Sequence, residues 1–185
     1  WNDGNGTNSG HTRIYAWNGS AWQQMGGDID GEAEGDYSGF SVSLSADGSI
    51  AAIGAYGNDG ISGSGHTRIY AWDGSAWQQR GDDIDGEAVN EWGGYSVSLS
   101  ADGTAVAIGA QLSNANGSRS GHTRIYTWDG SAWLKSGVDI NGEAAGDRAG
   151  TSVSLSADGT TVAIGAYLND DNGSDSGHVR IYQLS

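Results

Sequence analysis

The sequence predicts an all-β protein of the propeller type, an array of four-stranded antiparallel blades with about three blades plus partial strands at the two ends. The pair Gly-His recurs at Gly10, Gly65, Gly121 and Gly177, about every 55 residues. Each repeat contains four strand-like runs. Asp-Gly or Asn-Gly dipeptides separate several of these runs and predict tight hairpin turns. Four strands in a repeat of this size are typical of a propeller blade.

The strands are clearest between residues 96 and 135. Residues 96–100 alternate apolar and small polar side chains, which predicts a strand with one covered face. Residues 105–110 form a short apolar run, residues 122–128 are β-branched and aromatic, and residues 131–135 follow an Asp-Gly turn. This order predicts an antiparallel meander, followed by a long crossing to the next repeat. Nothing in it has the period of an amphipathic helix.

The whole chain, residues 1–185, is expected to be one propeller-repeat region. A partial unit covers about residues 1–40, full units cover 41–95 and 96–151, and a partial unit covers 152–185. A single small sheet cannot cover both of its faces, so neighbouring sheets must do so. Propellers usually close with about four to eight blades. We therefore expect a segment of a longer array, or a ring that another chain completes.

Two other architectures compete with this interpretation. An open stack of β-sheets would use the same strands without closing a ring. A β-solenoid would repeat about every 20 to 30 residues, so the longer period here disfavours it.

The composition excludes several functions. A net charge of −15, from 23 acidic against 8 basic side chains, disfavours nucleic acid and anionic lipid as partners. It suits divalent cations, or it serves solubility. The absence of cysteine excludes disulfides, thiol catalysis and cysteine-based zinc sites. No apolar run is long enough to cross a membrane, and no signal peptide is visible. A start at Trp1 is expected of a mature product, a fragment or the visible part of a longer chain.

The stretch from Gly39 to Ala55, GFSVSLSADGSIAAIGA, followed by Gly-His-Thr-Arg-Ile-Tyr, resembles the FG-GAP repeat of integrin α-chain propellers. The same order recurs in all three units, so the resemblance covers essentially the whole chain. It implies a propeller fold and an extracellular binding or adhesion role.

The chain departs from that family at the calcium loop of the first hairpin. The integrin-type pattern Asp-x-Asp-x-Asp-Gly-x-x-Asp is reduced to Ser-Ala-Asp-Gly at Asp47, Asp102 and Asp158. One carboxylate cannot supply the roughly six to eight oxygen ligands of Ca²⁺. These aspartates are therefore expected to shape the turn.

An acidic phrase joins each repeat to the next, with oxygen-bearing side chains at offsets 1, 3, 5 and 9 in every copy. Alternating oxygens in a glycine-containing loop suit a hard cation, so Ca²⁺ is the candidate cofactor. The alternative is that these side chains cap turns and hydrogen-bond the crossing. The twelve residues are Asp28, Asp30, Glu32, Asp36, Asp83, Asp85, Glu87, Glu91, Asp139, Asn141, Glu143 and Asp147.

The loop between the second and third strands is a weaker cation candidate. In its last copy Asp170, Asn172 and Asp175 could form a small cage, whereas the third copy offers only Asn side chains and Arg119. Turn chemistry explains both copies. Antiparallel alternation predicts that this loop and the acidic crossing lie at the same end of the molecule.

Every third strand begins with His-x-Arg. One histidine per repeat predicts a ring of structural side chains and not a metal cluster. The arginines are expected to form surface ion pairs with the acidic loops, or to stack on aromatic rings. The residues are His11, His66, His122 and His178, with Arg13, Arg68, Arg124 and Arg180.

Each second hairpin has one tryptophan on either side of a four-residue turn. We expect the two indoles to pack across the hairpin and to hold the outer strand in place. If they are exposed, they could instead stack on sugar rings. The pairs are Trp17 with Trp22, Trp72 with Trp77, and Trp128 with Trp133.

Four Asn-Gly-Ser/Thr sequences are candidate glycosylation sites in a secreted eukaryotic protein, or simply favourable turns. They start at Asn5, Asn18, Asn116 and Asn172.

The repeats argue against catalysis, because every candidate group is copied and none converges at a unique place. We expect a non-enzymatic, extracellular or cell-surface module for binding, adhesion or structural assembly. Its expected partners are other protein chains or further blades, and glycans, with no nucleic acid and no membrane insertion. The alternatives are a carbohydrate-binding propeller that uses the Trp hairpins, or an accessory domain of a hydrolase.

Overall fold

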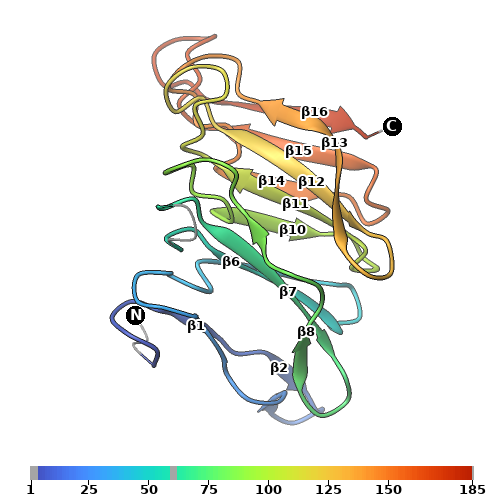
Figure 1. The fold of residues 1–185 in the computed structure, drawn as a ribbon. Helices are drawn as coiled ribbons and strands as arrows, with labels where there is room; N and C mark the ends of the chain where they lie inside the picture. Colours follow the sequence, from blue (N-terminus) through green and yellow to red (C-terminus); the bar gives the residue numbers. More distant parts are fainter. Residues whose placement is uncertain (1–3, 59–61, 185) are drawn as a thin grey trace.

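The computed structural model describes residues 4–58 and 62–184, and these residues form strands and turns with no helix (Figure 1). Every ladder between two strands is antiparallel. The predicted all-β meander is therefore confirmed. Because the described residues contain no helix, none of them can form a membrane-spanning helix.

The strands group into four repeats along the chain, which Figure 1 shows as a row of sheets. The first repeat has two short ladders, β1 with β4 and β2 with β3; the second pairs β5 to β8 in order, with β9 beside β7. The third is the sheet β10 to β13, and the fourth has three strands, β14 to β16.

The strands of the first two repeats are β1 (His11–Thr12), β2 (Tyr15–Trp17), β3 (Trp22–Gln24), β4 (Ile29–Asp30), β5 (Ser41–Leu44), β6 (Ile50–Ala55), β7 (His66–Trp72), β8 (Trp77–Gln79) and β9 (Ile84–Asp85). Those of the third and fourth repeats are β10 (Ser96–Leu99), β11 (Ala105–Ala110), β12 (His122–Trp128), β13 (Trp133–Asn141), β14 (Ser152–Leu155), β15 (Thr161–Ala166) and β16 (His178–Gln183).

The first hairpin closes as predicted in the second, third and fourth repeats. The carboxylate of Asp47 accepts hydrogen bonds from the Ser45 hydroxyl (2.7 Å) and the Ser49 amide (2.9 Å). Asp102 and Asp158 accept equivalent bonds in the next two full hairpins. These aspartates hold the turn, so a polar side chain there stabilises the hairpin without a cation.

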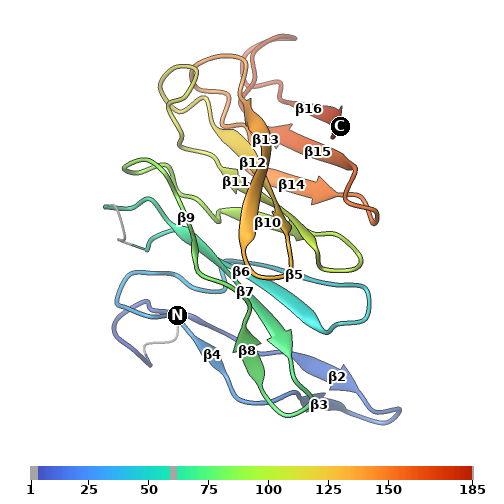
Figure 2. The same cartoon turned by 45° about the vertical axis from the view of Figure 1, so that its right-hand side comes forward.

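Neighbouring sheets pack face to face, and the apolar core lies between them (Figure 2). Ile69 of the second repeat packs in one cluster with Val97 and Leu99 of the third. Burying each such side chain contributes about 1.5 to 3 kcal/mol. No repeat covers its own faces, which is the behaviour expected of stacked repeat units.

The innermost strands approach one another closely, which explains their small residues. A Cβ atom added at Gly109 would lie 2.1 Å from the carbonyl oxygen of Gly150, in the segment that leads into β14 of the next repeat. The Ser98 hydroxyl accepts a hydrogen bond from the Leu155 amide over 2.9 Å. Only glycine and other small residues permit this backbone spacing.

The two ends of the row are incomplete, because the first repeat contributes only outer strands and the fourth contributes three strands. The predicted unit boundaries, and the number of repeats in a closed ring, stay predictions.

Candidate functional site

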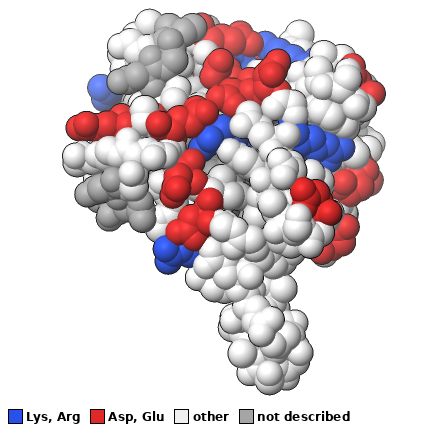
Figure 3. Space-filling model, turned by 60° about the horizontal axis from the view of Figure 1, so that its bottom comes forward, with Lys and Arg blue, Asp and Glu red and all other residues white. Residues whose placement is uncertain are grey.

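The acidic crossing and the loop between the second and third strands lie side by side, as predicted. The Gly35 amide donates to the Thr7 carbonyl (3.0 Å), and the Gly93 amide donates to the Ser64 carbonyl (2.7 Å). Figure 3 shows that acidic side chains greatly outnumber basic ones on one face of the molecule. The junctions between repeats combine these loops with the third-strand His and Arg side chains, and they form the candidate site.

Arg124 shows how a junction is built. Its guanidinium contacts three carboxylates, at 2.8 Å for Glu91, 3.1 Å for Glu87 and 3.1 Å for Asp139. Glu87 and Glu91 come from the preceding crossing, so the arginine ties two repeats together. The prediction of surface pairs is wrong at this position, because Arg124 is 8% exposed and Glu91 is 1% exposed. Stacking the next sheet removes both groups from water.

The other third-strand arginines make related contacts. Arg68 is also buried, and its Nη2 donates to the Asp30 carbonyl over 2.7 Å. Arg180 donates to the Asn141 carbonyl over 2.7 Å. Each arginine thus binds the backbone or the carboxylates of the repeat before it. Arg13 differs, because it pairs with Asp28, in its own repeat, at 2.7 Å.

The histidines at the start of the third strands are buried in the two inner repeats. His66 and His122 are each 1% exposed. Burial lowers the pKa of both imidazoles, that of His122 to about 4, so they are neutral near pH 7. The His66 Nδ1 faces Asp83 at 3.7 Å and Glu32 at 3.9 Å, beyond hydrogen-bond distance.

The structure brings together some of the predicted cation ligands in combinations that the sequence did not indicate. Within the described residues, three groups place their ligand atoms within 4.8 Å of one another. Two of the groups join carboxylates from different loops. All three include a third-strand histidine, a residue for which the sequence predicts a structural role. The groups are His11 with Asp28 and Asp30, Glu32 with His66 and Asp83, and Glu143 with Asp171 and His178.

At the junction between the second and third repeats, the carboxylates contact a lysine. Lys135 Nζ lies 2.5 Å from Asp139 and 3.3 Å from Glu87. The equivalent position in the second repeat is Gln79, whose amide donates to Asp83 over 2.6 Å. The Lys135 ammonium group therefore neutralises the carboxylates of its junction. At the preceding junction, the neutral Gln79 amide only donates a hydrogen bond to Asp83.

The acidic side chains at offset 9 are used by the crossing itself. Asp36 accepts from the Glu32 and Ala33 amides, at 2.9 and 2.8 Å. Glu91 and Asp147 accept equivalent bonds in the next two crossings. Asp85, at offset 3, is exposed. The twelve residues do not converge on one point within each loop, and calcium binding stays a prediction.

The loop cage proposed at Asp170, Asn172 and Asp175 forms turns. Asp170 accepts a hydrogen bond from the Asp175 amide over 2.7 Å, and Asp175 has a positive φ of 53°. Among the described residues, Asp170 and Asp175 are absent from the groups of His, Asp and Glu side chains that could hold a metal.

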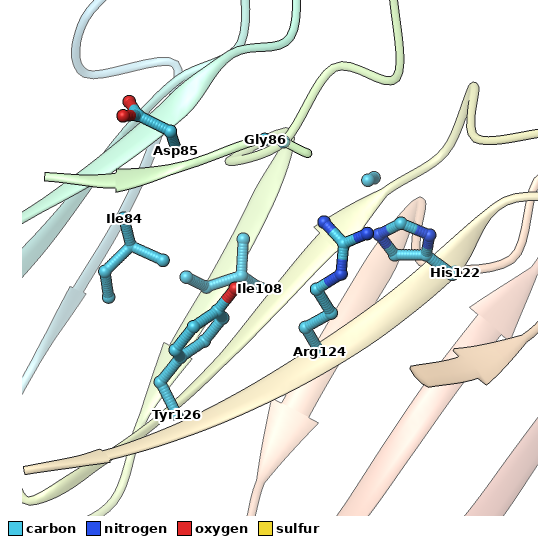
Figure 4. A pocket seen from close by; sticks show the side chains of 9 residues that line it. Ile84, Asp85, Gly86, Ile108, His122, Arg124 and Tyr126 are labelled. Carbon is cyan, nitrogen blue, oxygen red and sulfur yellow. The ribbon is translucent and has the colours of Figure 1, made fainter. Parts of the chain in front are cut away.

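One cavity at the junction between the second and third repeats is too small for a substrate. A larger, open hollow of about 290 Å³ lies beside it, lined by Asp82, Asp83, Ile84, Asp85, Tyr126, Ala132 and Trp133. Figure 4 shows Arg124, His122 and Tyr126 of β12 beside Ile84 and Ile108 around a small cavity. Its volume is about 10 Å³, which is about the space for a single water molecule. The arrangement can bind two sheets together, and its chemistry is that of a buried ionic contact.

The tryptophans pack across their hairpins, with ring centroids 5.6 Å apart for Trp17 and Trp22 and 5.4 Å apart in the other two pairs. Trp77 Nε1 donates to the Met25 carbonyl of the preceding repeat (2.9 Å), and Trp133 Nε1 donates to the Arg80 carbonyl (2.8 Å). The outer strands are thereby held to the neighbouring repeat as well as to their own sheet.

The first pair differs, because Trp17 and Trp22 are 55% and 67% exposed. Their tilt of 59° gives two separate ring faces and not one flat platform. Sugar stacking on the six tryptophans stays a prediction.

The four candidate glycosylation asparagines are all exposed. Asn116 Nδ2 already donates to the carbonyls of Gly142 (2.9 Å) and Glu143 (2.8 Å), and Asn5 Nδ2 donates to Gly31 (2.8 Å). Asn18 instead uses its Oδ1, which accepts from the Ser20 amide. Since a glycan replaces one Nδ2 hydrogen, it would disturb the bonds of Asn116 most. Glycosylation stays a prediction at each site.

Comparison with known proteins supports the fold. Three solved structures of low sequence identity share it: a complex of KlAtg21 with the coiled coil of AgAtg16 (TM-score 0.62, 13% identity, 93% of this chain and 47% of that chain), hydrazine synthase of Kuenenia stuttgartiensis (0.55, 13%, 93% and 40%), and a provisionally named 6-phosphogluconolactonase of Bacteroides uniformis (0.62, 13%, 95% and 44%). These folds are propeller-like, which confirms the predicted fold class. The chain spans less than half the length of each.

No curated protein sequence matches the chain. The FG-GAP repeat family matches residues 141–182, which run from the end of β13 through β16. The resemblance predicted from the sequence is confirmed over this stretch. Residues 141–182 are therefore similar to an FG-GAP repeat, and they lie in an all-β fold of the propeller type.

Proposed function

We propose that this chain is a non-enzymatic binding and structural module, at the cell surface or outside the cell, that packs against further repeats or other protein chains. Two features support an assembly role. At each junction between successive repeats the third-strand arginine (Arg68, Arg124 or Arg180) binds the repeat before it, and the row of sheets ends in uncovered apolar faces. The FG-GAP match and the resemblance to integrin propellers support the extracellular placement.

The exposed strand faces are the observation that carries this proposal. Val42 and Leu44 of β5 are 55% and 49% exposed, whereas the equivalent Val97 and Leu99 of β10 are 8% and 6% exposed. At the other end Val179 and Ile181 are 67% and 71% exposed. Contiguous apolar side chains of this kind mark interaction surfaces.

Sedimentation velocity over a range of protein concentrations tests the assembly role. We expect species heavier than the 19.0 kDa chain, and we expect Ile181→Asp to reduce them. Val89→Asp is the matched control, because Val89 is similarly exposed (53%) but lies in a crossing loop. A monomer at every concentration would remove the assembly role.

A protease added to intact source cells tests the placement. A chain at the cell surface is cleaved before the cells are opened, whereas a chain that is cleaved only after lysis would contradict the extracellular placement.

Carbohydrate binding is the second candidate, and the exposure of Trp17 and Trp22 favours it. Exposed indoles can stack on sugar rings. A glycan array with the wild-type chain and Trp22→Ala tests it, with Trp77→Ala as the comparison. Binding that depends on Trp22 alone would support this candidate, and the absence of binding to any glycan would remove it.

A further inference from the structure

The two internal junctions share one contact that the third lacks. Where the second repeat meets the first, the indoles of Trp72 and Trp77 both lie over Gly26, and Trp77 Nε1 donates to the Met25 carbonyl. Where the third repeat meets the second, Trp128 and Trp133 both lie over Gly81, and Trp133 Nε1 donates to the Arg80 carbonyl. In both cases the donating tryptophan begins the outer strand of its repeat.

Both glycines are needed to admit the ring. A Cβ atom at Gly26 would lie 2.9 Å from Trp72 and 3.4 Å from Trp77, and one at Gly81 would lie 2.8 Å from Trp128 and 3.1 Å from Trp133. These distances leave no space for a methyl group unless the indoles move. Each outer strand is thus bound at a two-residue site on the preceding repeat, a carbonyl followed by a glycine: Met25-Gly26 for β8 and Arg80-Gly81 for β13. We call this two-residue site the strand receptor.

The equivalent strand receptor of the third repeat is Ser136-Gly137, and no tryptophan of the described residues lies over its glycine. Ser136 and Gly137 follow β13's first residues as Arg80 and Gly81 follow β8, yet a Cβ at Gly137 would meet nothing within 4 Å. A groove of about 190 Å³ lies there, lined by Ser136, Gly137, Tyr182 and Leu184, among others. Within residues 4–58 and 62–184, no strand pairs with the second edge of β16, whereas β7 pairs with β8 and β12 pairs with β13 at the equivalent edge.

We propose that this groove and the second edge of β16 bind an outer β-strand that begins with Ser-Ala-Trp, supplied by a further repeat of the same type. The strand adds to the sheet by main-chain hydrogen bonds, and its indole N–H donates to the Ser136 carbonyl. The inference rests on the proposed function, because it names the partner strand through which the module packs.

Charge supports the same occupant. In the third repeat Lys135, two residues after Trp133, contacts Glu87 of the preceding crossing at 3.3 Å. The equivalent acid for the next strand is Glu143, which is 44% exposed at its side chain and pairs with Arg180. A strand that carries lysine at this position would add a second cation beside Glu143.

The test uses a fluorescein-labelled peptide of residues 131–141, SAWLKSGVDIN, and the intact chain. We expect saturable binding by fluorescence anisotropy and slower amide hydrogen exchange along β16. Replacing Trp133 by Ala in the peptide should weaken binding by about tenfold or more, since a tryptophan anchor dominates such a contact.

A matched pair of chain variants locates the site. Gly137→Ala should weaken the peptide to a similar degree, because its methyl group would meet the incoming indole. Gly146→Ala should not, although Gly146 has a comparable positive φ (95° against 73°) and equally open surroundings.

Three results would each overturn the inference: equal binding of the wild-type and Trp133→Ala peptides, no binding of either peptide, or binding that does not slow amide hydrogen exchange along β16. If the peptide fails while the chain still forms Ile181-dependent assemblies, the strand receptor is wrong and the proposed function stands. If both fail, the assembly role falls as well.

Discussion

Arg124 and Glu91, 33 residues apart in the chain, meet as an ion pair with 2.8 Å between Nη1 and Oε1 and with both side chains removed from water. The pair exists because one sheet is stacked on the next. It therefore reports on the integrity of the junction.

Replacing Glu91 by Ala should destabilise the chain strongly. The change leaves the Arg124 guanidinium without its buried partner, and breaking one side of a buried pair costs about 3 kcal/mol or more. Urea unfolding measures the change in free energy. Glu87→Ala is the control, because Glu87 is half-exposed and its pair should be worth about 1 kcal/mol or less. Equal effects of the two changes would contradict the buried-pair interpretation.

Replacing Gly109 by Ala should destabilise the junction between the third and fourth repeats. The added methyl group meets the Gly150 backbone oxygen, which cannot move without shifting the sheet, and overpacking of this kind costs about 1 to 3 kcal/mol. Thermal unfolding by circular dichroism measures the effect.

Gly165→Ala is its matched control. Gly165 occupies the same place in the fourth repeat, but its added Cβ atom meets mainly the Ser152 side chain, which can rotate away. We expect a clearly smaller loss of stability. A loss equal to that of Gly109→Ala would mean that close sheet-to-sheet approach is not the cause.

Replacing Trp133 by Phe removes the hydrogen bond to the Arg80 carbonyl while keeping an aromatic ring. The expected cost is about 1 kcal/mol, the net worth of one such bond. Trp22→Phe should cost less, because Trp22 is exposed and precedes the first complete repeat. Denaturant unfolding of both variants decides this, and a larger loss for Trp22→Phe would refute it.

Stability should fall as the pH falls from about 6.5 to 4. Burial lowers the pKa of His122 from its ordinary value of 6.5 to about 4, and it lowers that of His66 in the same direction. The unfolded chain then binds more protons than the folded chain in this window, so acid favours unfolding. Urea midpoints across this range measure the effect. His122→Asn should make stability less dependent on pH in this range. An unchanged slope would show that His122 does not cause the loss of stability.

A second loss of stability should follow at lower pH. Hydrogen bonds from Ser49 and Ser45 hold the pKa of Asp47 at about 2, below its ordinary 3.8. Because the folded-state pKa is depressed, this stabilisation is complete above pH 3.8 and disappears as the pH falls toward 2. Asp47→Asn should reduce the slope of stability against pH between pH 3.8 and 2. It should leave the slope between about pH 6.5 and 4 unchanged.

The local structure was predictable because it depends on nearby residues. Strand pattern, Asp-Gly turns and the repeat length gave the four-stranded meander, and the side chains of Asp47 and its copies hold turns as expected. The Trp pairs also followed from sequence, since a four-residue turn places Trp72 opposite Trp77. In each case the interacting groups lie a few residues apart.

The stacking of one sheet on the next decided the rest. The sequence could not indicate that Glu32 meets His66 and Asp83, that Arg124 is buried, or that the carbonyl before Gly81 receives Trp133. These partners are 17 to 53 residues apart. Burial and ligand geometry at such positions depend on how closely the next repeat approaches, and a single repeat does not contain that information.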